Sequence, residues 1–319
     1  MPRGDIESLV FEAVAHADAR CPRAASHPDT DSVAAEARAW AERGGLRPAA
    51  RGLPVDRVNP VAPVGEAMRE APADALRIVG FFATWLAALA EHGERTGWDV
   101  GYGESLADVL GGAADSGRAG TDVLHRALAE LVDRVTEAGG CALLPELADA
   151  LARHTAAAHR EHDWLARDVT PTLTEFLDNR VDRTSVPLLT VLHRLDPALG
   201  ALDGPAAPGV PQLTEIAGLL TGVDEDLIGF RHAVATGTRV TLVPVLMREY
   251  GHSVPAAFQS ATVLFGAWKT QLDHGVGAFE QEAGDPAPLR QARALVDWVA
   301  ALHHHHADLH VRHRAVPVG

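Results

Sequence analysis

Two pairs of acidic side chains have the spacing that metal binding or acid catalysis requires. Glu91 and Glu94 lie three residues apart at the end of an apolar stretch, so on a helix they share one face. Glu225 and Asp226 lie within a second apolar stretch. Carboxylates are ligands that Mg²⁺ prefers, and a carboxyl group that keeps its proton can act as a general acid. The alternatives are an exposed acidic helix end for the first pair and, for the second, acids placed at a helix N-terminus by its dipole.

Histidines form two further groups with metal-binding potential. His154, His159 and His162 have spacings of five and three, which fits either a metal pair or surface histidines. The four consecutive histidines at 303–306 point in different directions on a helix, so they cannot all bind one ion. We expect them to form a solvated or partly buried helix segment.

The elements that must position these residues are helical almost throughout. In the stretch 75–93, apolar residues recur at steps of three and four, which predicts a central helix. The remaining predicted helices cover residues 32–43, 122–138, 144–167, 173–179, 187–195, 213–235, 242–250, 254–280 and 287–313. Glycine- and proline-rich loops are expected at 44–64, 97–103 and 196–211. Strand character is weak and confined to residues such as 239–246, where Pro244 argues against an interior strand. The prediction is an all-α fold with one domain over residues 1–319, and with 1–27 and 315–319 as peripheral tails.

Composition narrows the function classes. The chain has 319 residues with a formal net charge of -15, which disfavours nonspecific nucleic-acid binding. Nowhere do eighteen apolar residues run uninterrupted, and the first residues do not look like a secretory signal. Two cysteines cannot make a disulfide framework. Phosphate-binding GxxxxGK[ST], dinucleotide-binding GxGxxG, HExxH and GxSxG motifs are absent. We therefore expect a cytoplasmic protein without a nucleic-acid partner or membrane span, with a homodimer as an open alternative.

Five segments, in order along the chain, resemble landmarks of bacterial class I terpene cyclases. They are HPDTDSVAAEARAWAERGGL, FFATWLAALAEHGE, PTLTEFLDNRVDRTS, VDEDLIGFRHAVATGTRVTLVPVLMREYG and DWVAALHHHHADLHVRHR. The resemblance implies a helical bundle around a deep apolar cavity, whose mouth lies near Glu91 and Glu225. It also implies an isoprenoid substrate, and in that family three magnesium ions hold a departing diphosphate.

The chain departs from the family's metal motifs at the decisive positions. The motif DDxxE or DDxxD is replaced by residues 90–94, so Ala90 stands where the leading aspartate would be. The motif NDxxSxxKE is replaced by a segment whose ligand positions are Glu225, Gly229 and Ala233. Glu91, Glu94 and Glu225 remain as possible ligands. We expect magnesium to bind weakly or not at all.

The chain matches the family more closely at the positions that contact phosphate. The resemblance places Arg180, with Arg183 as the competing register, at the diphosphate-sensing arginine, and Arg312 at the terminal Arg-Tyr. His232 replaces a phosphate-contacting lysine. These four are the candidate diphosphate- or substrate-binding residues. Aromatic rings that could line the cavity and stabilise a cation are Phe81, Phe82, Trp85, Phe176, Phe230 and Trp268.

Three functions remain open. The first is a magnesium-dependent terpene synthase with an altered metal set, and the second is an atypical cyclase that acts on an isoprenoid without the three-magnesium step. The third is a noncatalytic relative that binds a hydrophobic ligand or a partner protein. We favour the second, in which Glu91, Glu94, Glu225 or Asp226 protonates an alkene or epoxide, and His92 or His232 relays the proton.

Overall fold

The structure is a computed structural model in which helices account for almost every described element. It describes residues 3–46, 49–50, 53–54, 59–112, 122–200, 202, 206–281 and 286–314. The α-helices are α1 (Arg3–Asp18), α2 (Thr30–Gly44), α4 (Val61–Ala67), α5 (Ala73–Thr96), α6 (Val100–Leu110), α7 (Val123–Glu137), α8 (Leu144–Ala166), α9 (Leu173–Arg183), α10 (Val186–His193), α11 (Val210–Thr236), α12 (Leu242–Tyr250), α13 (Val254–Gln281) and α14 (Ala287–Arg314). Short 3₁₀ turns, η1 (Cys141–Leu143) and η2 (Pro197–Leu199), and an antiparallel pair of two-residue strands, β1 (Ala49–Ala50) and β2 (Leu53–Pro54), complete the described elements.

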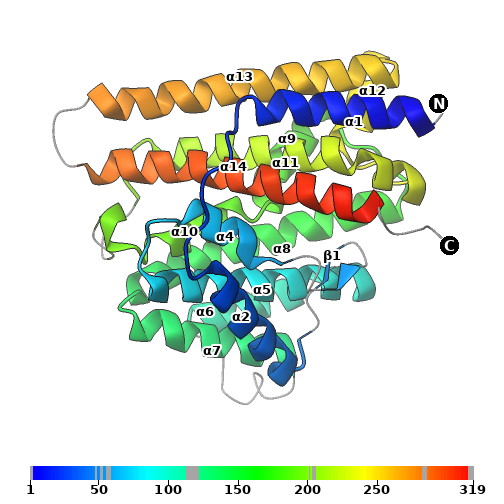
Figure 1. The fold of residues 1–319 in the computed structure, drawn as a ribbon. Coiled ribbons are helices and arrows are strands. Elements are labelled where there is room, and N and C mark those ends of the chain that lie inside the picture. The colour runs from blue at the N-terminus through cyan, green and yellow to red at the C-terminus, as the bar shows by residue number, and fades with distance from the viewer. Residues whose placement is uncertain are drawn as a thin grey trace.

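The long helices stack in layers whose axes run broadly in the same direction or its reverse, while α2 and α4 run obliquely to them (Figure 1). Helices α13, α12 and α1 form one edge, and α11 and α14 lie directly against them. Helices α8, α10 and α4 follow, and α5, α6, α2 and α7 form the other edge (Figure 1). The all-α prediction is confirmed.

Helix α5 forms part of the core, as its sequence predicts. Leu76, Val79, Phe82, Trp85 and Leu89 are almost completely buried, because apolar residues cover nearly the whole circumference of this helix. By length and composition α5 could cross a membrane, but most of it is buried among the other helices, as in the core helix of a bundle.

One predicted loop is wrong in part, because its glycines serve packing. Helix α6 begins at Val100, inside the loop predicted over residues 97–103, and the Asp99 side chain caps it by accepting a hydrogen bond from the Tyr102 N–H at 2.8 Å. A Cβ atom on Gly103 would lie 2.3 Å from the Thr155 hydroxyl of α8. Glycine is therefore needed there because α6 and α8 approach each other closely.

The expected N-terminal tail is also wrong. Residues 3–18 form α1, which packs against α11, α13 and α14 and buries Ile6, Val10, Ala13 and Ala17. Residues 315–319, expected as the other tail, lie outside the described residues. Helix α12 forms over 242–250 as predicted and includes most of the weakly strand-like stretch, with Leu242, Val243, Val245 and Leu246 buried.

Candidate functional site

A half-open cavity of about 220 Å³, with more apolar than polar surface, lies between the helices, and we call it the inner chamber. Its lining residues come from α4, α5, α8, α9, α10, α11, α14 and the segments beside them: Pro60, Pro63, Ala83, Leu86, Ala87, Ala90, His154, Arg183, Thr184, Ser185, Leu189, Thr221, Glu225, Ile228, Leu302, His305, His306 and Leu309. Helices α5 and α11 both contribute residues to the wall of this chamber.

The residues at the C-terminal end of α5 differ in which cavity they line. Ala90 lines the inner chamber together with Glu225, so the position without a ligand atom is the one that faces α11. Glu91 is half-buried and lines neither this chamber nor the neighbouring one described below. Glu94, one turn further along, is exposed and lines the neighbouring chamber. Of the two glutamates, only Glu94 therefore lines a chamber.

A second cavity of about 340 Å³ adjoins the first, and we call it the outer chamber. It shares Arg183 and Glu225 with the inner chamber. The remaining lining residues are Glu94, Trp98, Ala158, Glu161, His162, Leu165, Arg180, Asp226, Gly229, His232, Ala233, Thr238 and Thr241. Three of the four acids proposed from the sequence thus meet Arg180, Arg183 and His232 in one place.

Arg180 and Asp226 form a buried ion pair in the wall of the outer chamber. Arg180 Nη2 lies 2.6 Å from Asp226 Oδ1 and 3.3 Å from Glu225 Oε2, and it also donates to the Gly222 carbonyl oxygen at 3.1 Å. The second Asp226 oxygen accepts the Leu242 N–H at 3.1 Å. Burial raises the pKa of the Asp226 carboxyl, while the guanidinium of Arg180 acts in the opposite direction. Both side chains already have partners within the protein.

Arg183 is also paired. Its Nε donates to Glu161 Oε2 at 2.9 Å, and its guanidinium carbon lies 5.7 Å from the centroid of the Trp98 ring. His232 is exposed in the same chamber. The Arg312 side chain lies outside the described residues.

The donor set of the two chambers does not fit a cluster of three magnesium ions. Ala90 lines the inner chamber and Gly229 and Ala233 line the outer one, and none has a side-chain oxygen. Glu225 and Asp226 are both bonded to Arg180. A cluster of hard cations needs many oxygen ligands, and the site offers few that are not already engaged by a guanidinium.

The six aromatic residues that the sequence offered as candidates for the cavity wall line neither chamber. Phe81, Phe82, Trp85, Phe176 and Phe230 are buried in the core, and Trp268 packs partly buried against it. The rings contact other side chains instead, for example Phe82 with Trp85 at 5.4 Å between centroids. Helical spacing of aromatic residues therefore reflected core packing. Trp98, which the sequence did not single out, is the aromatic ring that lines the outer chamber.

The segment 303–306 is partly buried, as expected, but the hydrogen-bond network formed by His303, His304 and His306 was not predicted. His303 donates to Asp224 at 2.8 Å and bonds Asp18 at 3.0 Å through its other nitrogen. His306 bonds the second Asp224 oxygen at 3.2 Å. Donor atoms of Asp18, His303 and His304 lie within 4.8 Å of one another, but each nitrogen of the two rings already has a hydrogen-bond partner. The useful signal was the spacing of three between His303 and His306, which puts both rings on one face of α14.

The other histidine group does not form a metal pair. His154 is buried and its Nδ1 bonds the Asp182 carbonyl oxygen at 3.0 Å. His159 bonds the Trp98 carbonyl oxygen at 2.6 Å, and His162 is exposed in the wall of the outer chamber. His92, proposed as a proton relay, stacks on Tyr102 and lines neither chamber.

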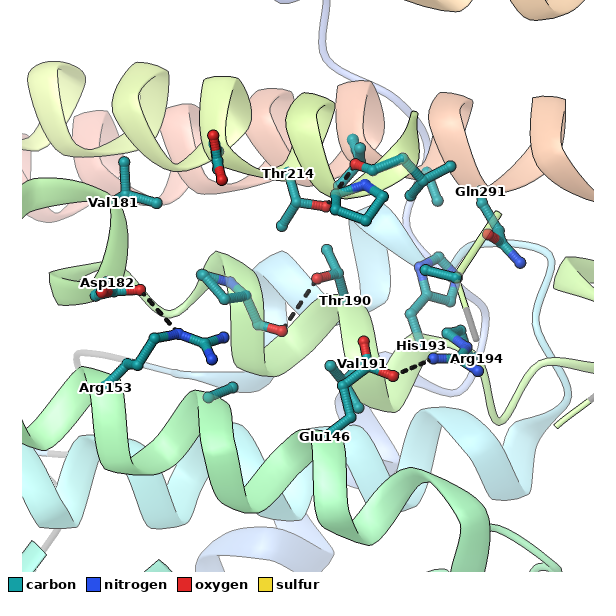
Figure 2. Close-up of a pocket in the computed structure, with 18 of the residues that line it drawn as sticks. Glu146, Arg153, Val181, Asp182, Thr190, Val191, His193, Arg194, Thr214 and Gln291 are labelled. Carbon is teal, nitrogen blue, oxygen red and sulfur yellow. Dashed lines mark hydrogen bonds and ion pairs between the residues drawn. The ribbon is translucent and has the colours of Figure 1, made fainter. Parts of the chain in front are cut away.

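A third cavity, of about 470 Å³, lies between α8, α9, α10, α11 and α14. Figure 2 shows two ion pairs in its wall, Arg153 with Asp182 and Arg194 with Glu146. His193, buried beside them, receives the Trp298 indole N–H at 3.1 Å. None of the candidate residues predicted from the sequence lines this cavity.

Comparison with known proteins agrees with this architecture. The family model described as terpene synthase family 2, C-terminal metal binding, matches residues 100–268. The crystal structure of the SVS_A2 protein from ancestral sequence reconstruction superposes with a TM-score of 0.72 at 18% identity, covering 92% of this chain and 88% of that one. Hedycaryol synthase in complex with nerolidol superposes with a TM-score of 0.67 at 15% identity, covering 90% and 96%. No curated protein sequence matches.

Proposed function

The chain belongs to terpene synthase family 2, and from that premise we propose that it is an atypical terpenoid cyclase. It cyclises or rearranges an uncharged isoprenoid in the inner chamber, without ionising a diphosphate on three magnesium ions. The observation that carries this proposal is the chemistry of the chamber walls. The inward positions of the two metal motifs lack ligands at Ala90, Gly229 and Ala233.

The charge of the outer chamber supports an uncharged substrate. Four carboxyl side chains line it, those of Glu94, Glu161, Glu225 and Asp226, against the two guanidinium groups of Arg180 and Arg183. If all four carboxyl groups are ionised, they exceed the two guanidinium groups by two negative charges, and when Glu225 carries the proton that it donates the excess is one. A diphosphate would add further negative charge to this partly desolvated space, where repulsion is stronger than in water.

Glu225 is the best placed acid for initiating the reaction. It lies in the wall of both chambers, so a proton on its carboxyl group can reach a substrate held in the inner chamber. Protonation of an alkene or epoxide makes a carbocation directly, which replaces loss of a leaving group. Asp226 does not line the inner chamber, and its two oxygens accept bonds from Arg180 and Leu242. We assign Asp226 and Arg180 to positioning, and His232 of the outer chamber to proton relay.

The test is a comparison of substrate classes. The purified protein is incubated with geranyl, farnesyl and geranylgeranyl diphosphates, and separately with hydrocarbons, alcohols and terminal epoxides of the same chain lengths. Each incubation is run with magnesium and with a chelator, and the products are identified by mass spectrometry. We expect cyclic products from an uncharged substrate in both conditions. Products formed only from a diphosphate and only with magnesium would contradict the proposal and favour a terpene synthase with an altered metal set.

Site variants test the role of Glu225. Glu225→Gln removes the acid and should reduce turnover by about 10²- to 10⁴-fold, the usual contribution of general acid catalysis. Glu91→Gln is the matched control, because Glu91 is also an acid of the metal-motif region but lines neither chamber. Equal activity of both variants would exclude Glu225 as the acid.

A further inference from the structure

Asp224 on helix α11 is hydrogen-bonded to two histidines of the neighbouring helix α14. The carboxylate is buried, its Oδ1 bonds His303 Nδ1 at 2.8 Å, and its Oδ2 bonds His306 Nδ1 at 3.2 Å. Burial would raise the pKa of Asp224, but the hydrogen bonds from these histidines keep it below the ordinary value. With an imidazole nitrogen at hydrogen-bond distance from each of its oxygens, Asp224 is the acceptor in both bonds.

The charges of this network determine which nitrogen of His306 carries a proton. Burial opposes protonation of His303, but its bonds to Asp224 and Asp18 raise its pKa to about 9, so this ring is an imidazolium that balances Asp224. An ionised carboxylate only accepts hydrogen bonds. His306 must therefore donate from Nδ1, and in its neutral form the lone pair is on Nε2. This nitrogen has no hydrogen-bond partner among the described residues.

His306 lies where a cation would be formed. It lines the inner chamber, whose wall also includes Glu225 and aliphatic side chains such as Leu86, Ile228 and Leu302. Its side chain is 16% exposed, so the ring is sheltered from solvent. Among the described residues, no Phe, Tyr or Trp side chain lines this chamber to hold a cation for long. A base within the chamber would end the reaction by removing a proton.

We propose that His306 is the base that terminates the cyclisation and that Asp224 positions it. The proton on the carbon beside the cationic centre moves to His306 Nε2, and the electrons of that C–H bond become the new alkene bond. Asp224 stabilises the resulting imidazolium, which returns its proton to water when the product leaves. This inference rests on the proposed function. Glu225 supplies one proton and His306 removes one, so the overall reaction is an isomerisation.

The first experiment measures the products of His306→Gln with a converted substrate. We expect the alkene fraction of the products to fall at least about fivefold in favour of alcohols formed by water capture, because a cation still forms but its base is gone. The matched control is His304→Gln. His304 bonds a carboxylate, that of Glu66, and lies on the same helix as His306 but does not line the inner chamber, so the product ratio of this variant should match the wild type. An unchanged ratio in His306→Gln would overturn the proposal.

The second experiment does not need a substrate. Nitrogen-15 NMR of histidine-labelled protein, assigned by comparison with His306→Gln, reports which ring nitrogen is protonated. We expect Nδ1 to be protonated and Nε2 unprotonated near neutral pH, and the preference to weaken in Asp224→Asn. A proton fixed on Nε2 would overturn the assignment of His306 as the base. If instead this tautomer is found but no isoprenoid is converted, the proposed function fails while the geometry of the pair stands.

Discussion

Replacing Arg180 with methionine should be among the most damaging single substitutions in this protein. The Arg180 side chain is 8% exposed and that of Asp226 is 3% exposed, with 2.6 Å between Nη2 and Oδ1. The variant leaves a buried carboxylate without its cation, which costs about 3 to 5 kcal/mol in comparable cases. That is a large part of the roughly 5 to 15 kcal/mol by which a domain is stable. Equilibrium unfolding in urea measures the loss directly.

A double variant separates the loss of the partner from the loss of packing. In Arg180→Met with Asp226→Asn, the amide oxygen can still accept the Leu242 N–H while the uncompensated charge is gone. We expect it to recover about 2 kcal/mol or more relative to the single variant, because neighbouring substitutions of this kind are strongly coupled. Arg183→Met is the control. Arg183 and Glu161 are both about one fifth exposed, and partly solvated pairs contribute about 1 kcal/mol or less.

The loss in Arg180→Met should also depend on pH. Burial raises the pKa of Asp226, and removing Arg180 raises it further, above the value in the unfolded chain. The stability contributed by such a group is fully present below the unfolded pKa and is lost as the pH rises through the folded pKa. The variant should therefore be closer to the wild type at about pH 5 than at about pH 8. A loss below about 1 kcal/mol at both pH values, or a double variant as unstable as the single one, would refute the reasoning.

Three further outcomes follow from the described contacts. Gly222→Ala should lose about 1 to 3 kcal/mol in urea unfolding, because its Cβ would lie 2.6 Å from Arg180 Cγ; an unchanged midpoint would show that the arginine can move aside. The contribution of His303 is fully present below its ordinary pKa near 6.5 and is lost as the pH rises through about 9, so the wild-type melting temperature should fall more steeply than that of His303→Gln across that pH range. Calorimetric titration with magnesium and inorganic diphosphate should show no tight binding of several ions; such binding would restore the usual cyclase interpretation.

The helical pattern predicted much of the fold, because long apolar periodicities are local signals. The helix predicted over 75–93 is α5, and the helix predicted over 254–280 is α13 within a residue or two. The error at residues 97–103 has a physical cause. Gly103 is required by the close approach of Thr155, which lies 52 residues further along the chain, and no local pattern records such a contact.

The sequence indicated several residues of the candidate site but not the pairs that their side chains form. The resemblance to a known family singled out Glu225, Asp226 and Arg180, and in the structure Arg180 bonds both carboxyl groups. The sequence did not predict that Arg180 would be satisfied by Asp226, nor that His306 would meet Asp224 from another helix. These pairings depend on how helices rotate against one another when they pack.

The network around His303 also has a consequence for folding order. Asp18 of α1 bonds His303, the Cys21 carbonyl oxygen bonds His304, and Arg23 pairs with Asp308, so the first and last described helices are joined beside the inner chamber. Contacts between such distant parts of a chain form late, because closing so long a loop is costly until the intervening helices have packed. On the ribosome, α1 must wait until α14 has emerged. The inner chamber should therefore reach its final form in the last step of folding. In a refolding experiment, the circular dichroism signal of the helices should reach its final value before enzymatic activity does.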